Sequence, residues 1–146
     1  MNARKICGFV CAVPHDHRNL DLALLLIRLS LGAIFIAHGW AKVSNIDGAI
    51  AMFASMGIGT MLTYVAAYTE LLGGIAILLG VATRLAGGLL SVVMVVAIAL
   101  VHFKNGFDMA NGGYEYQLLI LVCAIAIAIV GPGKYSLHDK WCKKMY

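Results

Sequence analysis

Four long apolar runs restrict the fold of this chain more than any other feature of its sequence. A helix needs about 20 residues to cross the hydrocarbon core of a bilayer, with a usual range of about 17–25. Two runs reach this length, a third lies at the short end, and the last must include flanking residues. Because a spanning segment must satisfy its own backbone hydrogen bonds, the runs predict an all-α membrane protein, a four-transmembrane-helix bundle. The runs are Leu20–Ala41, Met61–Val81, Leu85–Val101 and Tyr116–Val130.

The composition excludes an ordinary soluble domain. Apolar residues make up 62% of the 146 residues and charged residues 12%, whereas soluble domains contain about 45–50% and about 25%. A soluble fold of this size has too little interior for so much apolar surface. The net charge of +4 is not accompanied by an aromatic-basic patch, so membrane lipid is the expected partner and nucleic acid is not.

The segments between the runs predict how the helices connect. Residues 42–60 carry polar residues and glycines, and their middle, Ala49–Met56, is apolar enough for a short interfacial helix. Residues 82–84 form a very tight turn, so the second and third helices should be antiparallel neighbours. Residues 102–115 predict a loop, and the Gly-Pro-Gly sequence at 131–133 should end the last helix.

The basic residues outside the runs predict the orientation. Lys42 and Lys104 fall on one side of the membrane, and eight others fall on the opposite side. Because cytoplasmic loops carry the excess of Lys and Arg, both termini should be cytoplasmic, in a multi-pass protein of the cell (inner) membrane. This gives a cytoplasmic tail at 1–19, a transmembrane domain at 20–131 and a basic cytoplasmic tail at 132–146. The eight residues are Arg4, Lys5, Arg18, Arg84, Lys134, Lys140, Lys143 and Lys144.

The two tails hold three of the four cysteines. The apolar stretch 6–13 is short for a signal peptide and no A-x-A-like site follows it, so we expect a retained leader that touches the membrane surface; cleavage is the alternative. Cys7, Cys11 and Cys142 match neither a disulfide framework nor a zinc site, and reduced thiols are expected in the cytoplasm. The fourth cysteine, Cys123, lies alone in the last run.

Two ionisable side chains, Arg28 and Glu70, lie deep within the runs. Such groups are costly in a bilayer and suggest a functional site by default. Arg28 precedes His38 by about 15 Å along the helix axis, and Glu70 lies about 14 Å into the second run. Because the helices should be antiparallel, we predict an Arg28–Glu70 ion pair, which either serves a site or only orients the two helices.

Each of these two residues belongs to a stripe of small residues on its helix. Small side chains allow helices to approach closely in a membrane, so the first and second helices should pack along these stripes. The first stripe is Arg28, Gly32, Phe35, Gly39 and Lys42, and the second is Thr63, Ala66, Ala67, Glu70, Gly73 and Gly74.

Titratable residues gather at the predicted non-cytoplasmic end: His38, Lys42, His102, Lys104 and Glu115. Histidine and glutamate are suited to proton exchange. We therefore predict a proton-handling pocket formed by His38, His102, Glu115 and Lys42, although each residue alone could be an interfacial anchor. His38, His102 and Glu115 could form a two-His, one-carboxylate ligand set, but their spacing matches no metal motif and no metal is predicted.

Four segments of the sequence resemble the DoxX family of small integral membrane proteins. The resemblance extends from Leu22 to Asp139, and it places residues such as Arg28, His38, Glu70 and Glu115 in family positions. His138 stands where an aspartate is usual. The segments are RLSLGAIFIAHGWAKV, AYTELLGGIAILLGVATRLAG, NGGYEYQLLIL and GPGKYSLHD.

The resemblance implies four membrane helices and an association with redox chemistry. Our leading hypothesis is a membrane component of a redox system, a subunit of a quinone-linked oxidoreductase that acts on small sulfur or thiol substrates. No intrinsic cofactor is expected, so electrons would come from a substrate or from a redox partner protein. The alternatives are a non-enzymatic membrane anchor or assembly scaffold, and a small carrier. The sequence carries no signal of oligomeric state.

Overall fold

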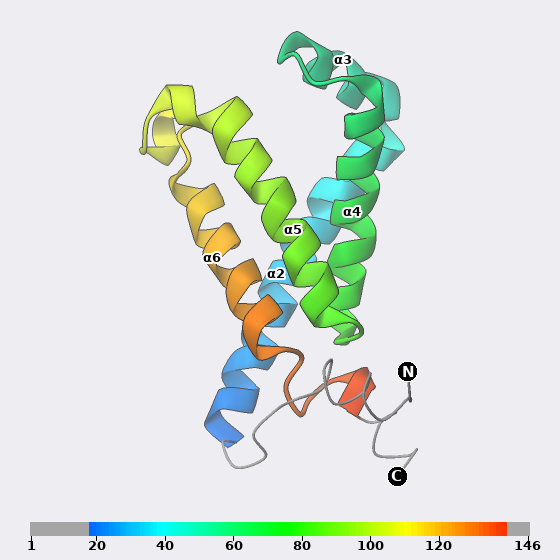
Figure 1. The fold of residues 1–146 in the computed structure, drawn as a ribbon, viewed down its shortest axis with the longest axis vertical. Helices are drawn as coiled ribbons and strands as arrows, with labels where there is room; N and C mark the ends of the chain where they lie inside the picture. Colours follow the sequence, from blue (N-terminus) through cyan, green and yellow to red (C-terminus); the bar gives the residue numbers. More distant parts are fainter. Residues whose placement is uncertain (1–17, 140–146) are drawn as a thin grey trace.

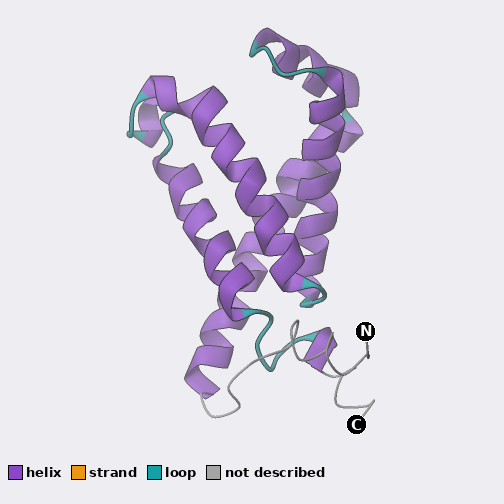
Figure 2. Cartoon of the chain, in the orientation of Figure 1, coloured by secondary structure: helices purple, strands orange, loops and turns teal. Residues whose placement is uncertain are grey.

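The computed structural model describes residues 18–139, and every regular element in this part of the chain is helical (Figures 1 and 2). The predicted all-helical class is therefore confirmed. Four long α-helices are joined by a short helix and by loops that contain brief π- and 3₁₀-helical turns. The helices are α2 (Arg18–Ser44), α3 (Ile46–Ser55), α4 (Thr60–Leu79), α5 (Thr83–Ala97) and α6 (Glu115–Val130), with turns η1 (Ile98–His102), η2 (Phe103–Asn105) and η3 (Met109–Asn111).

The helices form two pairs that diverge toward one end of the molecule. Figure 1 shows α5 and α6 side by side and α4 beside α2, with the two pairs closest near the turn between α4 and α5. The opposite end carries α3 on one pair and the 98–114 loop on the other. The start of α2 and the segment after α6 both lie at the closed end, as an even number of antiparallel helices requires.

Within residues 18–139, three stretches are long and apolar enough to cross a membrane: 19–44, 60–79 and 83–105. Helix α6 is also strongly apolar, but its 16 residues extend about 24 Å, less than the hydrocarbon thickness of about 30 Å. Large apolar side chains cover much of the outer surface of the bundle. A soluble protein rarely exposes so much apolar surface, whereas a bilayer accommodates it.

Helices α2 and α4 pack closely along the predicted stripes of small residues. A Cβ atom added to Gly32 would lie 2.9 Å from the Cβ of Leu78, and one added to Gly74 would lie 2.8 Å from the backbone nitrogen of Ile36. A Cβ atom on Gly39 would collide with the backbone of Leu71. These contacts confirm that the stripes face each other, except that Gly73 faces Leu90 of α5.

The connections end the helices as their residues predict. Gly80 follows α4 with a φ of 73° and its N–H donates to carbonyls of the last turn, which is the usual role of a left-handed glycine cap. Residues 81–82 then lead directly into α5. The short α3 agrees with the helix expected within 42–60, and Asn45 caps its N-terminus, where the Asn45 side chain accepts the N–H of Gly48.

We expect Gly39→Ala to destabilise the protein, because the added methyl group would force α2 away from the backbone of α4. Gly88→Ala is the matched control, since nothing lies within 4 Å of the added Cβ and alanine is more favourable than glycine in a helix by about 1 kcal/mol. Thermal unfolding in detergent should show a lower midpoint for Gly39→Ala and an unchanged or higher midpoint for Gly88→Ala. Equal midpoints for the two variants would contradict this packing.

A polar chamber as candidate functional site

The buried Arg28 lies at the closed end of the bundle and donates hydrogen bonds to four carbonyl oxygens. Its Nε donates to Ile77 (2.9 Å) and its Nη2 to Leu78 (3.0 Å), at the end of α4. Its Nη1 donates to Pro132 (2.8 Å) and Tyr135 (2.9 Å), after α6. The side chain is 1% exposed. Arg28 therefore ties together α2, the last turn of α4 and the C-terminal segment.

The predicted Arg28–Glu70 ion pair is wrong. The prediction measured depth from His38, but α2 continues six residues further, to Ser44, which adds about 9 Å. Gly39 consequently lies beside the backbone of Glu70, whereas Arg28, about three turns before Gly39 on α2, lies beside the end of α4. Glu70 instead pairs with Lys42.

Asp21 is a buried acid that the sequence reasoning missed. It is 3% exposed and its carboxylate accepts the backbone N–H of Lys134 (2.9 Å). Asp21 and Arg28 thus hold the segment after α6 against α2, and Pro132, Gly133 and Ser136 are buried there. The signal was present in the sequence, since Asp21 lies seven residues, or two turns, before Arg28 on the same helix face.

The ion pair between Lys42 and Glu70 joins α2 to α4 at the diverging end. Lys42 Nζ lies 2.5 Å from a carboxylate oxygen of Glu70, and the two side chains are 16% and 9% exposed. Removing either partner would leave a poorly hydrated charge without its counter-ion, which is costly. This pair forms one wall of a cavity of about 190 Å³.

This cavity, which we call the polar chamber, lies between the two helix pairs. Its polar groups are His38, Lys42, Glu70, His102, Tyr116 and Gln117. The floor is apolar and includes Phe35, Met94 and Ile120. Residues from α2, α4, α5, η1 and α6 therefore meet in one space, and an apolar pocket with a few convergent polar groups is typical of a ligand site.

His102 is held in the chamber wall by both ring nitrogens. Its Nδ1 lies 2.9 Å from the carbonyl oxygen of Gly112, which can only accept, so Nδ1 carries the proton. The neutral ring then accepts at Nε2 from the Gln117 side-chain amide (3.2 Å). The residue ends η1, a π-helical turn, and such turns are frequent at functional sites.

Gln117, which lines the chamber, is the second residue that the sequence reasoning missed. Its side-chain oxygen Oε1 is buried and has no hydrogen-bond partner within residues 18–139. A buried acceptor left unpaired costs about 1–3 kcal/mol, so this atom suits a donor on a bound molecule. Its position as a polar residue inside an apolar run was the available signal.

The structure brings together only some of the titratable residues predicted to cluster at the non-cytoplasmic end. His38, Lys42 and His102 line the chamber. Glu115 is exposed at the start of α6, where its carboxylate accepts the N–H of Met109 at 3.4 Å, and it does not line the chamber. Lys104 is also exposed. Within the described residues no three His, Cys, Asp or Glu side chains are grouped to hold a metal, so the His38, His102 and Glu115 ligand set is not assembled.

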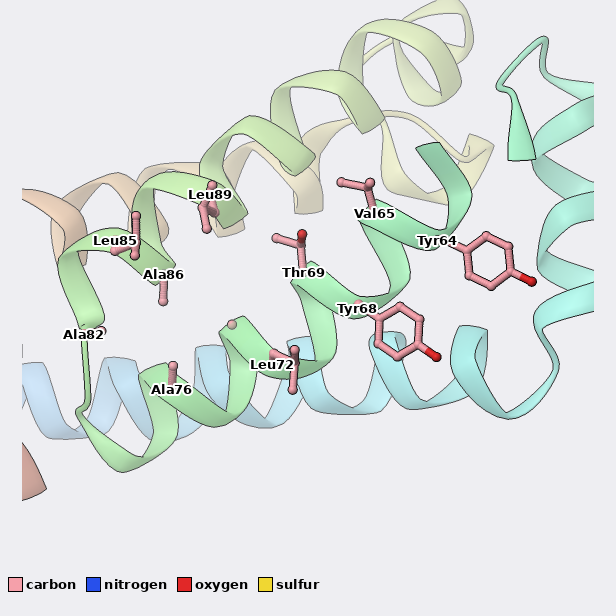
Figure 3. A pocket seen from close by; sticks show the side chains of 11 residues that line it. Tyr64, Val65, Tyr68, Thr69, Leu72, Ala76, Ala82, Leu85, Ala86 and Leu89 are labelled. Carbon is pink, nitrogen blue, oxygen red and sulfur yellow. The ribbon is translucent and has the colours of Figure 1, made fainter. Parts of the chain in front are cut away.

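Two other hollows have different characters. A depression of about 360 Å³ beneath α3 shares His38 and Lys42 with the polar chamber and adds Asn45. A larger groove of about 530 Å³ between α4 and α5 is almost wholly apolar (Figure 3). Figure 3 shows the rings of Tyr64 and Tyr68 projecting in the same direction from α4. This groove brings no titratable groups together beyond these tyrosines, so the polar chamber is the better candidate site.

Comparisons with known proteins identify a family and relatives of the chain. Residues 23–103 match the family model described as DoxX. The chain is 35% identical over 115 residues to "Putative oxidoreductase CatD" of Bacillus subtilis (strain 168), covering 79% of this chain and 84% of CatD. It is 27% identical over 125 residues to "Inner membrane protein YqjF" of Escherichia coli (strain K12), covering 83% and 96%. No solved structure matches the chain.

Replacing Arg28 by methionine should destabilise the fold by about 3 kcal/mol, because several buried carbonyl groups would lose their donor. The expected readout is a lower thermal midpoint in detergent and reduced abundance in the membrane. Lys104→Met, which removes an exposed cation, is the control and should match the wild type. An Arg28→Met protein as stable as the control would refute the structural role of this arginine.

Proposed function

The chain belongs to the DoxX family of membrane proteins, and on that basis we propose that it is the membrane component of a redox system that handles a quinone ring in the polar chamber. The name of CatD supports an oxidoreductase role, and the name of YqjF supports a location in the inner membrane. The specific proposal depends on the size of the chamber and on its polar groups.

The volume of the chamber suits a single ring. An apolar protein cavity of about 150 Å³ accepts benzene, and the chamber measures about 190 Å³. Pockets for larger, drug-sized molecules usually measure about 300–1,000 Å³. One substituted six-membered ring is therefore the largest aromatic group that this space would hold.

The observation that carries the proposal is the unpaired Oε1 of Gln117 beside His102. The oxidised ring of a quinone presents carbonyl oxygens, which accept hydrogen bonds, and the reduced ring presents hydroxyl groups, which also donate. Gln117 Oε1 would accept from a hydroxyl of the reduced ring. Lys42, which also lines the chamber, would donate to a carbonyl of the oxidised ring. The chamber thus offers both kinds of partner.

The proposed reaction couples two small thiols to one quinone. The two thiols lose two electrons and two protons and form one disulfide bond, and the ring gains both electrons and both protons to become a quinol. In this scheme the electrons come from the thiols. In the same scheme His102 relays protons from the thiols to the ring through Nε2, which gives up its contact with the Gln117 amide to do so, while the Nδ1 proton stays in the hydrogen bond to Gly112.

Purified protein in lipid nanodiscs should reduce a fully substituted benzoquinone at the expense of a small thiol such as cysteine, faster than protein-free nanodiscs do. His102→Phe should lower this rate about 100-fold, which is the usual scale for loss of a proton-transfer group. Lys104→Ala is the control, because this lysine is exposed on the same loop and lies outside the chamber. The quinone absorbance gives the rate.

Two results would overturn the proposal. If wild-type protein does not exceed the protein-free rate with any small thiol, the chamber has no thiol–quinone activity. If His102→Phe matches the wild type, His102 does not transfer protons. The second result, together with a loss of abundance in Glu70→Gln, is what the membrane-anchor alternative predicts.

A further inference from the structure

A second, apolar groove adjoins the polar chamber. It lies between α2 and α6 and encloses about 280 Å³. The side chains along it are almost all apolar, with Ser30, Tyr116 and Cys123 as its polar groups. From Leu26 to Ile34 on α2 the groove extends for about 12 Å. It is therefore shaped for a chain-like apolar group.

The groove and the chamber adjoin each other. Ile34, Tyr116 and Ile120 line both of them. On α2 the spacing of Ile27, Ile34 and His38 places these residues along one stripe, which leads from the groove to the polar end of the chamber. A molecule with a polar ring and an apolar chain could therefore occupy both spaces at once.

We propose that the groove between α2 and α6 holds the isoprenoid or alkyl chain of a lipid-soluble quinone whose ring occupies the chamber. The ligand reaches the site laterally from the bilayer, ring first, and the chain remains between the two helices. This inference rests on the proposed function and specifies its substrate class, a quinone with a chain. Water-soluble quinones without a chain use the chamber alone.

A separate pocket between α4 and α5, which Phe53 of α3 also lines and which is not the groove of Figure 3, is the competing route. It measures about 220 Å³ and meets the chamber at Glu70 and Ala97. Glu70 is held there by its ion pair with Lys42, so a ring that passed this way would meet the paired charges. The residues shared with the α2–α6 groove, by contrast, carry no charge. The α2–α6 groove is therefore the favoured path.

Cys123 provides the test, because it lines the α2–α6 groove and is partly accessible. Replacing Cys7, Cys11 and Cys142 by serine leaves Cys123 as the sole thiol. The probe is an apolar maleimide, applied to this protein in nanodiscs with a fully substituted benzoquinone that carries an alkyl chain. At about ten times its Kd, the quinone should slow the labelling of Cys123 about tenfold. The same ring without a chain should leave the rate unchanged.

A cysteine in the competing pocket is the matched control. Val93→Cys, made with Cys123→Ala in the same serine background, lines the α4–α5 pocket and should be labelled at the same rate with and without the quinone. Equal slowing at both positions would mean general partitioning into lipid and would overturn the inference. So would protection of Val93→Cys alone, or no protection of Cys123.

The thiol–quinone assay separates the two proposals. If turnover is intact and Cys123 is unprotected, the proposal of a ring site in the chamber is retained, and the proposal that the α2–α6 groove binds the chain is refuted. If turnover is absent and neither quinone affects Cys123, both the proposed function and the inference fail.

Discussion

The close approach of α2 and α4 is the constraint on which the rest of the structure depends. Glycines at 32, 39 and 74 bring the two backbones together and fix their register. That register places Lys42 opposite Glu70 at the diverging end, and it places Arg28 beside the exposed carbonyls of the last turn of α4. The register of α2 against α4 thus determines both the closed end and the diverging end that contains the polar chamber.

The two ends have opposite physical characters. At the closed end, Arg28 and Asp21 bond to backbone groups and hold the C-terminal segment, so the cation there is used as a structural donor. At the other end, the helix pairs diverge, and the Lys42–Glu70 and His102–Gln117 pairs border a small space. The proposed ring site uses both features: a stable base, and a cavity between the helix pairs that borders the α2–α6 groove.

Hydropathy predicted the four long helices because a bilayer requires apolar runs of a certain length, and the glycine stripes predicted the α2–α4 contact. The prediction of an Arg28–Glu70 pair was wrong because apolar runs do not mark where a helix ends. Helix α2 continues through Lys42 to Ser44. The His102–Gln117 contact could not be derived either, since it depends on the π-helical turn and on the angle between α5 and α6. Local pattern therefore gave the helices, and tertiary register decided which polar residues meet.

The most direct test of a ring site in the chamber is photo-crosslinking with an azido-substituted quinone, followed by mass spectrometry of the labelled peptides. Our account predicts adducts on chamber residues such as Met94, Tyr116 and Ile120, and their loss when excess unlabelled quinone is present. Adducts confined to the groove of Figure 3, at Leu72 or Leu85, would contradict a ring site in the chamber.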